Sequence, residues 1–217
     1  MSITQLKPWE HAFMKILMDV KRLDAIIICE GRSDVEVYKS VLRKLTSGVE
    51  RRVSIGFTDA EGLDNIPELA TAIATLSKHS RKLKTLVIAI DADEYRAEDR
   101  ASGLVDSLRA RGIVVESFEK CGLYDQVYVA NISSNGRRLK VLILVNGDFT
   151  IPAKKHVLED HCVKLLGIPV ERSIDSSKEL IGDIGACIKR IEELPRNVVC
   201  EYFRHICRAL EVELQDP

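Results

Sequence analysis

Residues 25–30 read Ala-Ile-Ile-Ile-Cys-Glu, and residues 85–93 read Thr-Leu-Val-Ile-Ala-Ile-Asp-Ala-Asp. Short runs rich in β-branched residues are typical of strands buried on both faces, the pattern of a parallel sheet in an α/β protein. Ligands of such sheets gather at the carboxyl ends of the strands, where loops and helix N-termini meet. Glu30, Asp91 and Asp93 all follow such ends, so the two stretches predict both an α/β fold and the place of a site.

Three carboxylates at one edge of a sheet favour a bound divalent cation. Like charges repel one another unless a positive charge lies among them, and hard oxygen ligands suit Mg²⁺ or Mn²⁺. Alternate residues of an extended segment face the same way, so Asp91 and Asp93 are both able to reach one ion. Two structural alternatives stay open. Glu30 could be a helix-entry carboxylate favoured by the helix dipole, and the Asp pair could cap the following helix.

The residues around the two strands resemble the Toprim domain, which topoisomerases, bacterial primases, recombination mediators and overcoming-lysogenization-defect (OLD) nucleases share. Its signature is a strand ending in Glu-Gly with a nearby Asp, here Glu30-Gly31-Arg32-Ser33-Asp34, and a later strand ending in Asp-x-Asp, here Asp91-Ala92-Asp93. Residues 62–67 look like the glycine-containing turn that opens the second helix of OLD-type proteins. The resemblance covers about residues 22–120. It departs from the family at Arg96, where many Toprim domains have Gly.

This resemblance implies metal-dependent phosphoryl transfer, with Glu30 as the general acid/base and with Asp91 and Asp93 as ligands of Mg²⁺ or Mn²⁺. The pair Leu158-Glu159 is similar to the one that supplies a further metal ligand in OLD-type nucleases, although Glu is also an ordinary surface residue of helices. The candidate substrate-binding residues are Gly31, Arg32, Asp34, Lys154 and Lys155. Paired lysines at a helix start are usually just solvated, which is the alternative for the last two.

Within the Toprim superfamily, the chain resembles small, stand-alone, OLD-nuclease-like proteins, and the reaction expected is hydrolysis of nucleic-acid phosphodiesters, of DNA or RNA. A topoisomerase would need a nucleophilic tyrosine on a second module, and a primase would need a zinc ribbon and further domains. OLD nucleases carry an ATPase on the same chain, so a separate ATPase or another protein partner is expected here. The main alternative is a non-catalytic Toprim module that binds nucleic acid, nucleotide or a protein in DNA repair or phage defence.

Two other kinds of site are disfavoured. A phospho-acceptor receiver domain usually has adjacent acidic residues after its first strand, whereas Glu30 is followed by Gly31. A zinc site at His156, His161 and Cys162 would have a spacing that matches no standard zinc pattern.

The composition limits what can be expected of nucleic-acid binding, of the state of the cysteines and of membrane association. The 217 residues carry a formal net charge of −1, so any nucleic-acid contact must depend on a local patch or on metal. The six cysteines are scattered without a Cys-x-x-Cys pair, and reduced thiols in a cytoplasmic protein are expected. No apolar stretch is long enough to span a bilayer, and no signal core is present at the start, so no membrane association is expected.

The order of elements predicts one Rossmann-like α/β domain and a helical addition. Residues 1–150 are expected to form a Toprim-like domain with an N-terminal helix at 8–23, helices at 34–45, from 65 and at 97–111, and strands at 52–57 and 113–115. Ser134-Asn135-Gly136 between two strand-like runs predicts an antiparallel hairpin extension. Residues 151–217 are expected to form a C-terminal helical segment packed on the domain, with helices at 153–166, 177–194 and 196–214.

Overall fold

The computed structural model describes residues 2–5, 20–47, 53–122 and 126–215. Its centre is a seven-stranded sheet with the order β1-β3-β2-β4-β7-β6-β5. The strands are β1 (Ser2–Gln5), β2 (Ala25–Cys29), β3 (Ser54–Asp59), β4 (Thr85–Asp91), β5 (Val114–Lys120), β6 (Val127–Ser134) and β7 (Arg137–Asn146). The pairs from β1 to β7 are parallel, whereas β5, β6 and β7 pair antiparallel. The predicted fold class, a mainly parallel sheet with an antiparallel extension, is confirmed.

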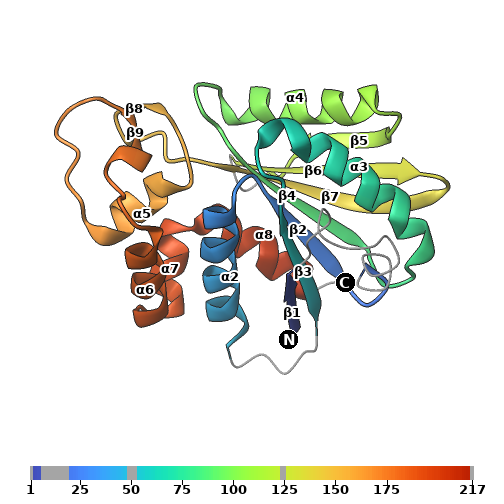
Figure 1. Ribbon diagram of the computed structural model, residues 1–217, viewed down its shortest axis with the longest axis horizontal. Helices are drawn as coiled ribbons and strands as arrows, with labels where there is room; N and C mark the ends of the chain where they lie inside the picture. Colours follow the sequence, from blue (N-terminus) through green and yellow to red (C-terminus); the bar gives the residue numbers. More distant parts are fainter. Residues whose placement is uncertain (1, 6–19, 48–52, 123–125, 216–217) are drawn as a thin grey trace.

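Helices cover both faces of this sheet (Figure 1). On one face, α3 (Ile66–Leu76) and α4 (Ala97–Ala110) share a hydrophobic core with the sheet. On the other face lie α2 (Arg32–Thr46), α5 (Glu159–Leu166), α6 (Ile184–Glu193), α7 (Arg196–Tyr202) and α8 (Arg204–Gln215). Because both faces are covered, all seven residues of β4 are buried, which explains its continuous apolar sequence.

The antiparallel extension forms as the turn chemistry predicts. Asn135 and Gly136 both have positive φ, 49° and 75°, the conformation of a two-residue hairpin turn whose twist matches its strands. The strand predicted at 113–115 forms as the start of β5, which is longer, lies at the sheet edge and pairs with β6. The strand predicted at 52–57 lies two residues later, as β3. Most of the helix predicted at 8–23 falls outside the described residues.

The helix boundaries predicted after residue 151 are wrong in three places. Residues 153–155 form a short strand, β8 (Ala153–Lys155), parallel to β9 (Ile174–Ser176), and α5 begins only at Glu159. The predicted helix 177–194 is a 3-10 turn, η3 (Ser177–Glu179), followed by α6, which starts where the side chain of Asp183 accepts a hydrogen bond from Gly185. The predicted helix 196–214 breaks at Phe203 into α7 and α8.

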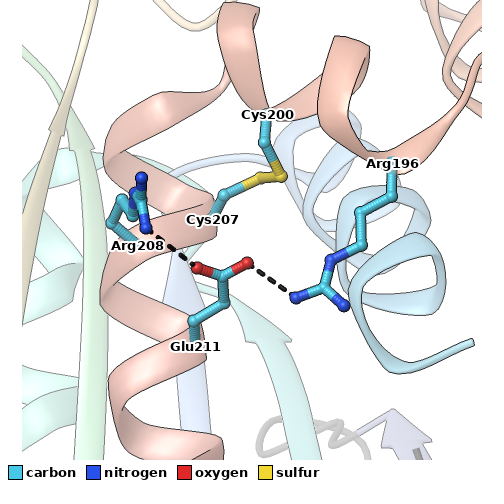
Figure 2. Close-up of a disulfide and its surroundings, with 5 residues drawn as sticks. All are labelled: Arg196, Cys200, Cys207, Arg208 and Glu211. Carbon is cyan, nitrogen blue, oxygen red and sulfur yellow. Dashed lines mark hydrogen bonds and ion pairs between the residues drawn. A yellow bond between two sulfur atoms is a disulfide. The ribbon is translucent and has the colours of Figure 1, made fainter.

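Two disulfides lie within these C-terminal helices. Cys162 of α5 is joined to Cys187 of α6, and Cys200 of α7 to Cys207 of α8. Figure 2 shows the second bridge at the corner between α7 and α8, beside the ion pairs of Glu211 with two arginines. The expectation of reduced thiols is therefore wrong for these four cysteines. Among the residues that the structure places, no helix is both long and apolar enough to cross a bilayer.

Candidate functional site

The site begins with polar side chains at the ends of three adjacent strands. Glu30 follows β2, Asp91 is the last residue of β4, and Asn146 is the last residue of β7. Asp91 and Asn146 are register partners across the parallel pair, so their side chains emerge at the same edge. The sequence predicted the first two positions, and the third also closes a buried run.

Asp91 is almost fully buried, since it is 1% exposed. Its Oδ1 accepts hydrogen bonds from the backbone N–H of Leu158 at 3.0 Å and from Nδ2 of Asn146 at 3.3 Å. Its Oδ2 lies 3.3 Å from Nζ of Lys178. Burial nevertheless raises the pKa of Asp91, although the Lys178 ammonium and these hydrogen bonds oppose the rise.

Glu30 and Asp34 share the negative field of Asp91. Burial, followed by the charges of Asp91 and Asp93, raises the pKa of Glu30. Burial and the charge of Asp91 raise the pKa of Asp34 to about 7, although its Oδ2 accepts a hydrogen bond from the backbone N–H of Gly31 at 3.0 Å. Asp34 therefore caps the start of α2. Two carboxyl groups with raised pKa values are candidates for proton transfer.

Glu159 joins the same cluster from the start of α5. Its side chain is 7% exposed, so the alternative that it is an ordinary surface residue is wrong. Burial, opposed by the charge of Lys178 and reinforced by that of Asp91, raises its pKa. Lys178, on η3, is the cation that these carboxylates share, and their charges raise its own pKa against the effect of burial. Sequence reasoning missed Lys178.

The cluster contains oxygen atoms without hydrogen-bond donors. Oε2 of Glu30 and Oε2 of Glu159 are buried and have no hydrogen-bond partner in the part of the chain that the structure describes. Such oxygens are costly to leave unmet, and they are the donor type that Mg²⁺ and Mn²⁺ prefer. The chemistry of the donor set therefore fits a hard divalent ion. As the side chains stand in the described ranges, however, no group of three His, Cys, Asp or Glu residues is gathered closely enough to hold one.

Asp93 is held differently from Asp91. Its carboxylate is ion-paired with the Arg100 guanidinium, which also donates to the backbone carbonyl of Asp91 at 2.9 Å. Its backbone has φ +52° and exchanges two hydrogen bonds of 2.9 Å with His156. A positive φ is uncommon for a residue other than Gly, and here the bridge to His156 holds it in place. Asp93 thus adds charge to the site, while its carboxylate is tied to Arg100.

The remaining candidates fall into two groups. Gly31 and the exposed Arg32 lie at the start of α2, next to the cluster. Lys154 and Lys155 lie in β8 rather than at a helix start, and Lys154 is 3.8 Å from Asp175 in an exposed ion pair. A zinc site with Cys162 is ruled out in this structure because its sulfur is bonded to Cys187.

A buried polar network adjoins the cluster at Asn146. Oδ1 of Asn146 accepts a hydrogen bond from the hydroxyl of Tyr38 at 2.7 Å and lies 3.3 Å from Nε2 of His205. The chain then turns at Gly147, whose φ is +124° and where a Cβ would lie 2.6 Å from Cβ of His156. Only glycine allows this close approach, so Gly147 fixes the segment that carries His156 next to Asp93.

Comparison with known proteins gives a family and no activity. No curated protein and no solved structure matches the chain significantly. A family model described as "Protein of unknown function (DUF3226)" matches residues 24–197, which span β2 to the start of α7 and include every residue of the cluster. Since the match covers most of the 217 residues, the chain belongs to this DUF3226 family.

Proposed function

We propose that this protein is a Toprim-like, metal-dependent nuclease that hydrolyses nucleic-acid phosphodiesters. The observation that carries the proposal is the meeting of Glu30, Asp91 and Glu159 with Lys178 at the carboxyl ends of parallel strands. Buried carboxylates with raised pKa values around one lysine are unusual in a purely structural role, because each costs free energy to bury. The order of the Glu-Gly and Asp-x-Asp motifs supports the same class.

In this proposal some side chains bind the metal ion, one transfers a proton and one binds phosphate. Asp91 and Glu159, with Asp93 once it leaves Arg100, would hold Mg²⁺ or Mn²⁺, which would offset charge on the phosphoryl oxygens. Glu30 has a raised pKa and a buried, unpartnered oxygen, so it suits proton transfer to or from water or the leaving oxygen. The Lys178 side chain is 53% exposed and can place its ammonium against a phosphate oxygen.

A second candidate has its own supporting observation. Lys178 and Arg100 already pair with Asp91 and Asp93, so protein cations take the place that metal would occupy in an active nuclease. That arrangement suits a non-catalytic Toprim module, which binds nucleic acid, nucleotide or a protein partner such as a separate ATPase. The two candidates differ in whether a phosphodiester is cleaved.

The experiment is a cleavage assay with single-stranded and double-stranded DNA and RNA in Mg²⁺ or Mn²⁺. If Glu30 transfers the proton and Asp91 holds the metal, Glu30→Gln and Asp91→Asn should each lower the rate by at least about 10²-fold. Arg109→Ala is the matched control, because its exposed side chain pairs with Asp106 of the same helix and with no other carboxylate that the structure describes. Activity that survives both site substitutions would come from a contaminant. Metal-dependent binding without cleavage would favour the non-catalytic module.

A further inference from the structure

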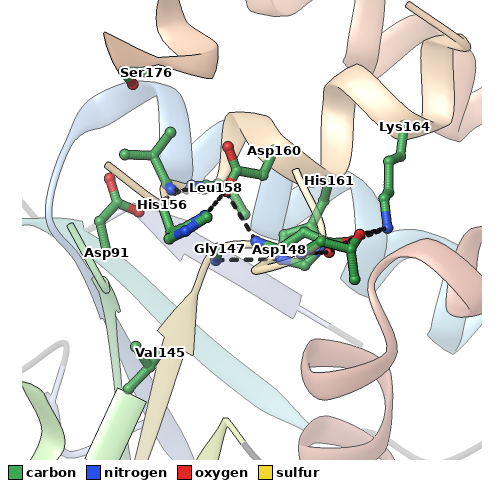
Figure 3. Close-up of polar contacts among 12 residues, drawn as sticks. Asp91, Val145, Gly147, Asp148, His156, Leu158, Asp160, His161, Lys164 and Ser176 are labelled. Carbon is green, nitrogen blue, oxygen red and sulfur yellow. Dashed lines mark hydrogen bonds and ion pairs between the residues drawn. The ribbon is translucent and has the colours of Figure 1, made fainter. Parts of the chain in front are cut away.

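A groove opens beside the acidic cluster and is not part of it. Its volume is about 700 Å³, and it lies between the start of α4, the loop after β7 and the corner between α7 and α8. Lys164 and Asp148, which pair at 2.5 Å, form one wall. In Figure 3 the segment Gly147–Asp148 lies between Asp91 and Lys164, so this segment divides the cluster from the groove. A groove of this size is large enough for a nucleotide-sized ligand.

The imidazole of His205 lies at the wall of the groove. His205 lines the groove and is 4% exposed. Burial and the neighbouring His161 lower its pKa well below the usual range, so the ring is neutral and carries one N–H and one lone pair. Because Nε2 faces Oδ1 of Asn146, which already accepts from Tyr38, Nε2 carries the proton. Nδ1 is then the acceptor nitrogen of the ring.

His161 differs from His205 in this respect. Its Nε2 accepts from the backbone N–H of Gly147 at 3.4 Å, and a hydrogen bond to the backbone of Tyr202 engages the ring from the other side. The two imidazoles contact each other with centroids 4.7 Å apart. His161 therefore supports the ring of His205, whose Nδ1 is the acceptor nitrogen. A nucleobase has at least one N–H group that can donate a hydrogen bond to such a nitrogen.

Aromatic rings are available for stacking at the same groove. Phe149 lines it and is 47% exposed, which is uncommon for a phenylalanine. Its ring contacts the ring of His156 with centroids 4.6 Å apart, so it is held in place rather than free to rotate into solvent. Tyr202 adds a second partly exposed ring from the end of α7. Exposed, positioned aromatics are the platforms on which unpaired bases stack.

The charges around the groove are balanced rather than strongly positive. Arg96 and Arg204 line it and form no ion pair with any residue in the described ranges, so both are available to a phosphate. Glu98 and Glu201 line it as well, which limits a purely electrostatic attraction. Affinity must therefore come mainly from stacking and hydrogen bonding, with the arginines placing the backbone.

One amide group joins the groove to the acidic cluster. Asn146 contacts Asp91 through Nδ2 and His205 through Oδ1, each at 3.3 Å. A strand with one phosphodiester at Asp91 would therefore have a neighbouring nucleotide within reach of His205. A base in a duplex is paired and stacked, and it cannot enter such a groove without leaving the helix.

We propose that this groove binds one unpaired nucleotide of a single-stranded nucleic acid, with the base between Phe149 and His205 and its phosphate at Arg96 or Arg204. The proposal rests on the nucleic-acid substrate proposed above and narrows it to single strands. It assigns the groove a role in binding the substrate, separate from the acidic cluster that would cleave it.

The test is fluorescence anisotropy with labelled single-stranded DNA, single-stranded RNA and a duplex of the same sequence, in EDTA so that no cleavage occurs. Phe149→Ala should weaken single-strand binding at least about fivefold, because it removes a stacking platform. Arg204→Ala should lower the slope of log affinity against log salt by about one. The matched controls are Val114→Ala, an exposed apolar residue at the opposite end of β5 from the groove, and Arg109→Ala.

The outcomes separate this proposal from the nuclease. The groove proposal is overturned if Phe149→Ala and Arg204→Ala bind single strands as the wild type does. It is also overturned if the wild type binds no single strand or prefers the duplex. Both results would count against the groove even where Glu30-dependent cleavage is found. If the groove variants weaken binding and no substrate is cleaved, the groove proposal stands and the nuclease falls. The DNA and RNA arms show which sugar the groove accepts.

Discussion

Replacing Asp34 by Asn should stabilise the metal-free protein at alkaline pH. Asp34 is 5% exposed, and burial with the charge of Asp91 raises its pKa from 3.8 to about 7. A rise of that size, 7 − 3.8, corresponds to about 4 kcal/mol of unfavourable free energy when the group is ionised in the fold. Asn keeps an oxygen that can accept the hydrogen bond from Gly31 and carries no charge.

The pH dependence has a definite sign. Because the folded-state pKa lies above the unfolded one, the fold binds more protons than the unfolded chain between pH 3.8 and about 7. The contribution of Asp34 is therefore most favourable below this window and is lost as the pH rises through it. Asp34→Asn should gain close to the full amount at about pH 8 and a small fraction of it at about pH 4.5.

Urea unfolding in EDTA at the two pH values measures this difference. With a slope of about 1–3 kcal/mol per molar urea, the midpoint at alkaline pH should rise by about 1 M or more. Asp106→Asn is the matched control, since this exposed carboxylate pairs with Arg109 on the surface and should change the midpoint little. An unchanged midpoint for Asp34→Asn at alkaline pH, or an equal rise at both pH values, would refute the view that Asp34 is strained by burial beside Asp91.

Two further predictions follow from the cluster and from the disulfides. Millimolar Mn²⁺ should raise the melting temperature of the wild type, because only the native state assembles the carboxylates that bind the ion. The rise should be largely lost in Asp91→Asn. An equal shift in both proteins would mean that the ion binds elsewhere. Replacing both cysteines of the Cys162–Cys187 bridge by Ser should lower the free energy of unfolding by about 3–4 kcal/mol. The same replacement at Cys200–Cys207 should lower it by about 2 kcal/mol, because that bridge closes the shorter loop. Urea titrations of the two double variants check this order, and a larger loss from the shorter loop would contradict it.

The sequence predicted the parallel core because a strand that is buried on both faces needs apolar residues at every position, and such a run is visible in the local sequence. The strands β2 and β4 appear as continuous apolar runs, and the carboxylates that follow them are placed by the strand ends alone. The hairpin was predictable for a similar reason, since Asn135 and Gly136 set the turn by themselves. In these cases the information lies within a few neighbouring residues.

Other parts of the site depend on contacts between distant segments. Lys178 is 87 residues from Asp91, and nothing in its own neighbourhood marks it as the cation of the cluster. Residues 153–156 were predicted to be helical, but β8 pairs with β9 and His156 pairs with Asp93, so tertiary pairing overrides local propensity. The disulfide partners have no shared motif and meet only because α5 packs against α6 and α7 folds back on α8. Asn146 could have been found, because it ends a third buried run.

The charge balance of the cluster bears on which of the two candidate functions is right. Glu30, Asp34, Asp91 and Glu159 would carry four negative charges if all were ionised, and Lys178 offsets one of them. The raised pKa values of the four carboxyl groups are the consequence of this excess together with burial. A module that only needed a stable fold could remove the excess with neutral side chains at no cost in packing. Retaining it makes physical sense where a further positive charge is bound in the working state, which is why the metal-dependent nuclease is the better supported of the two.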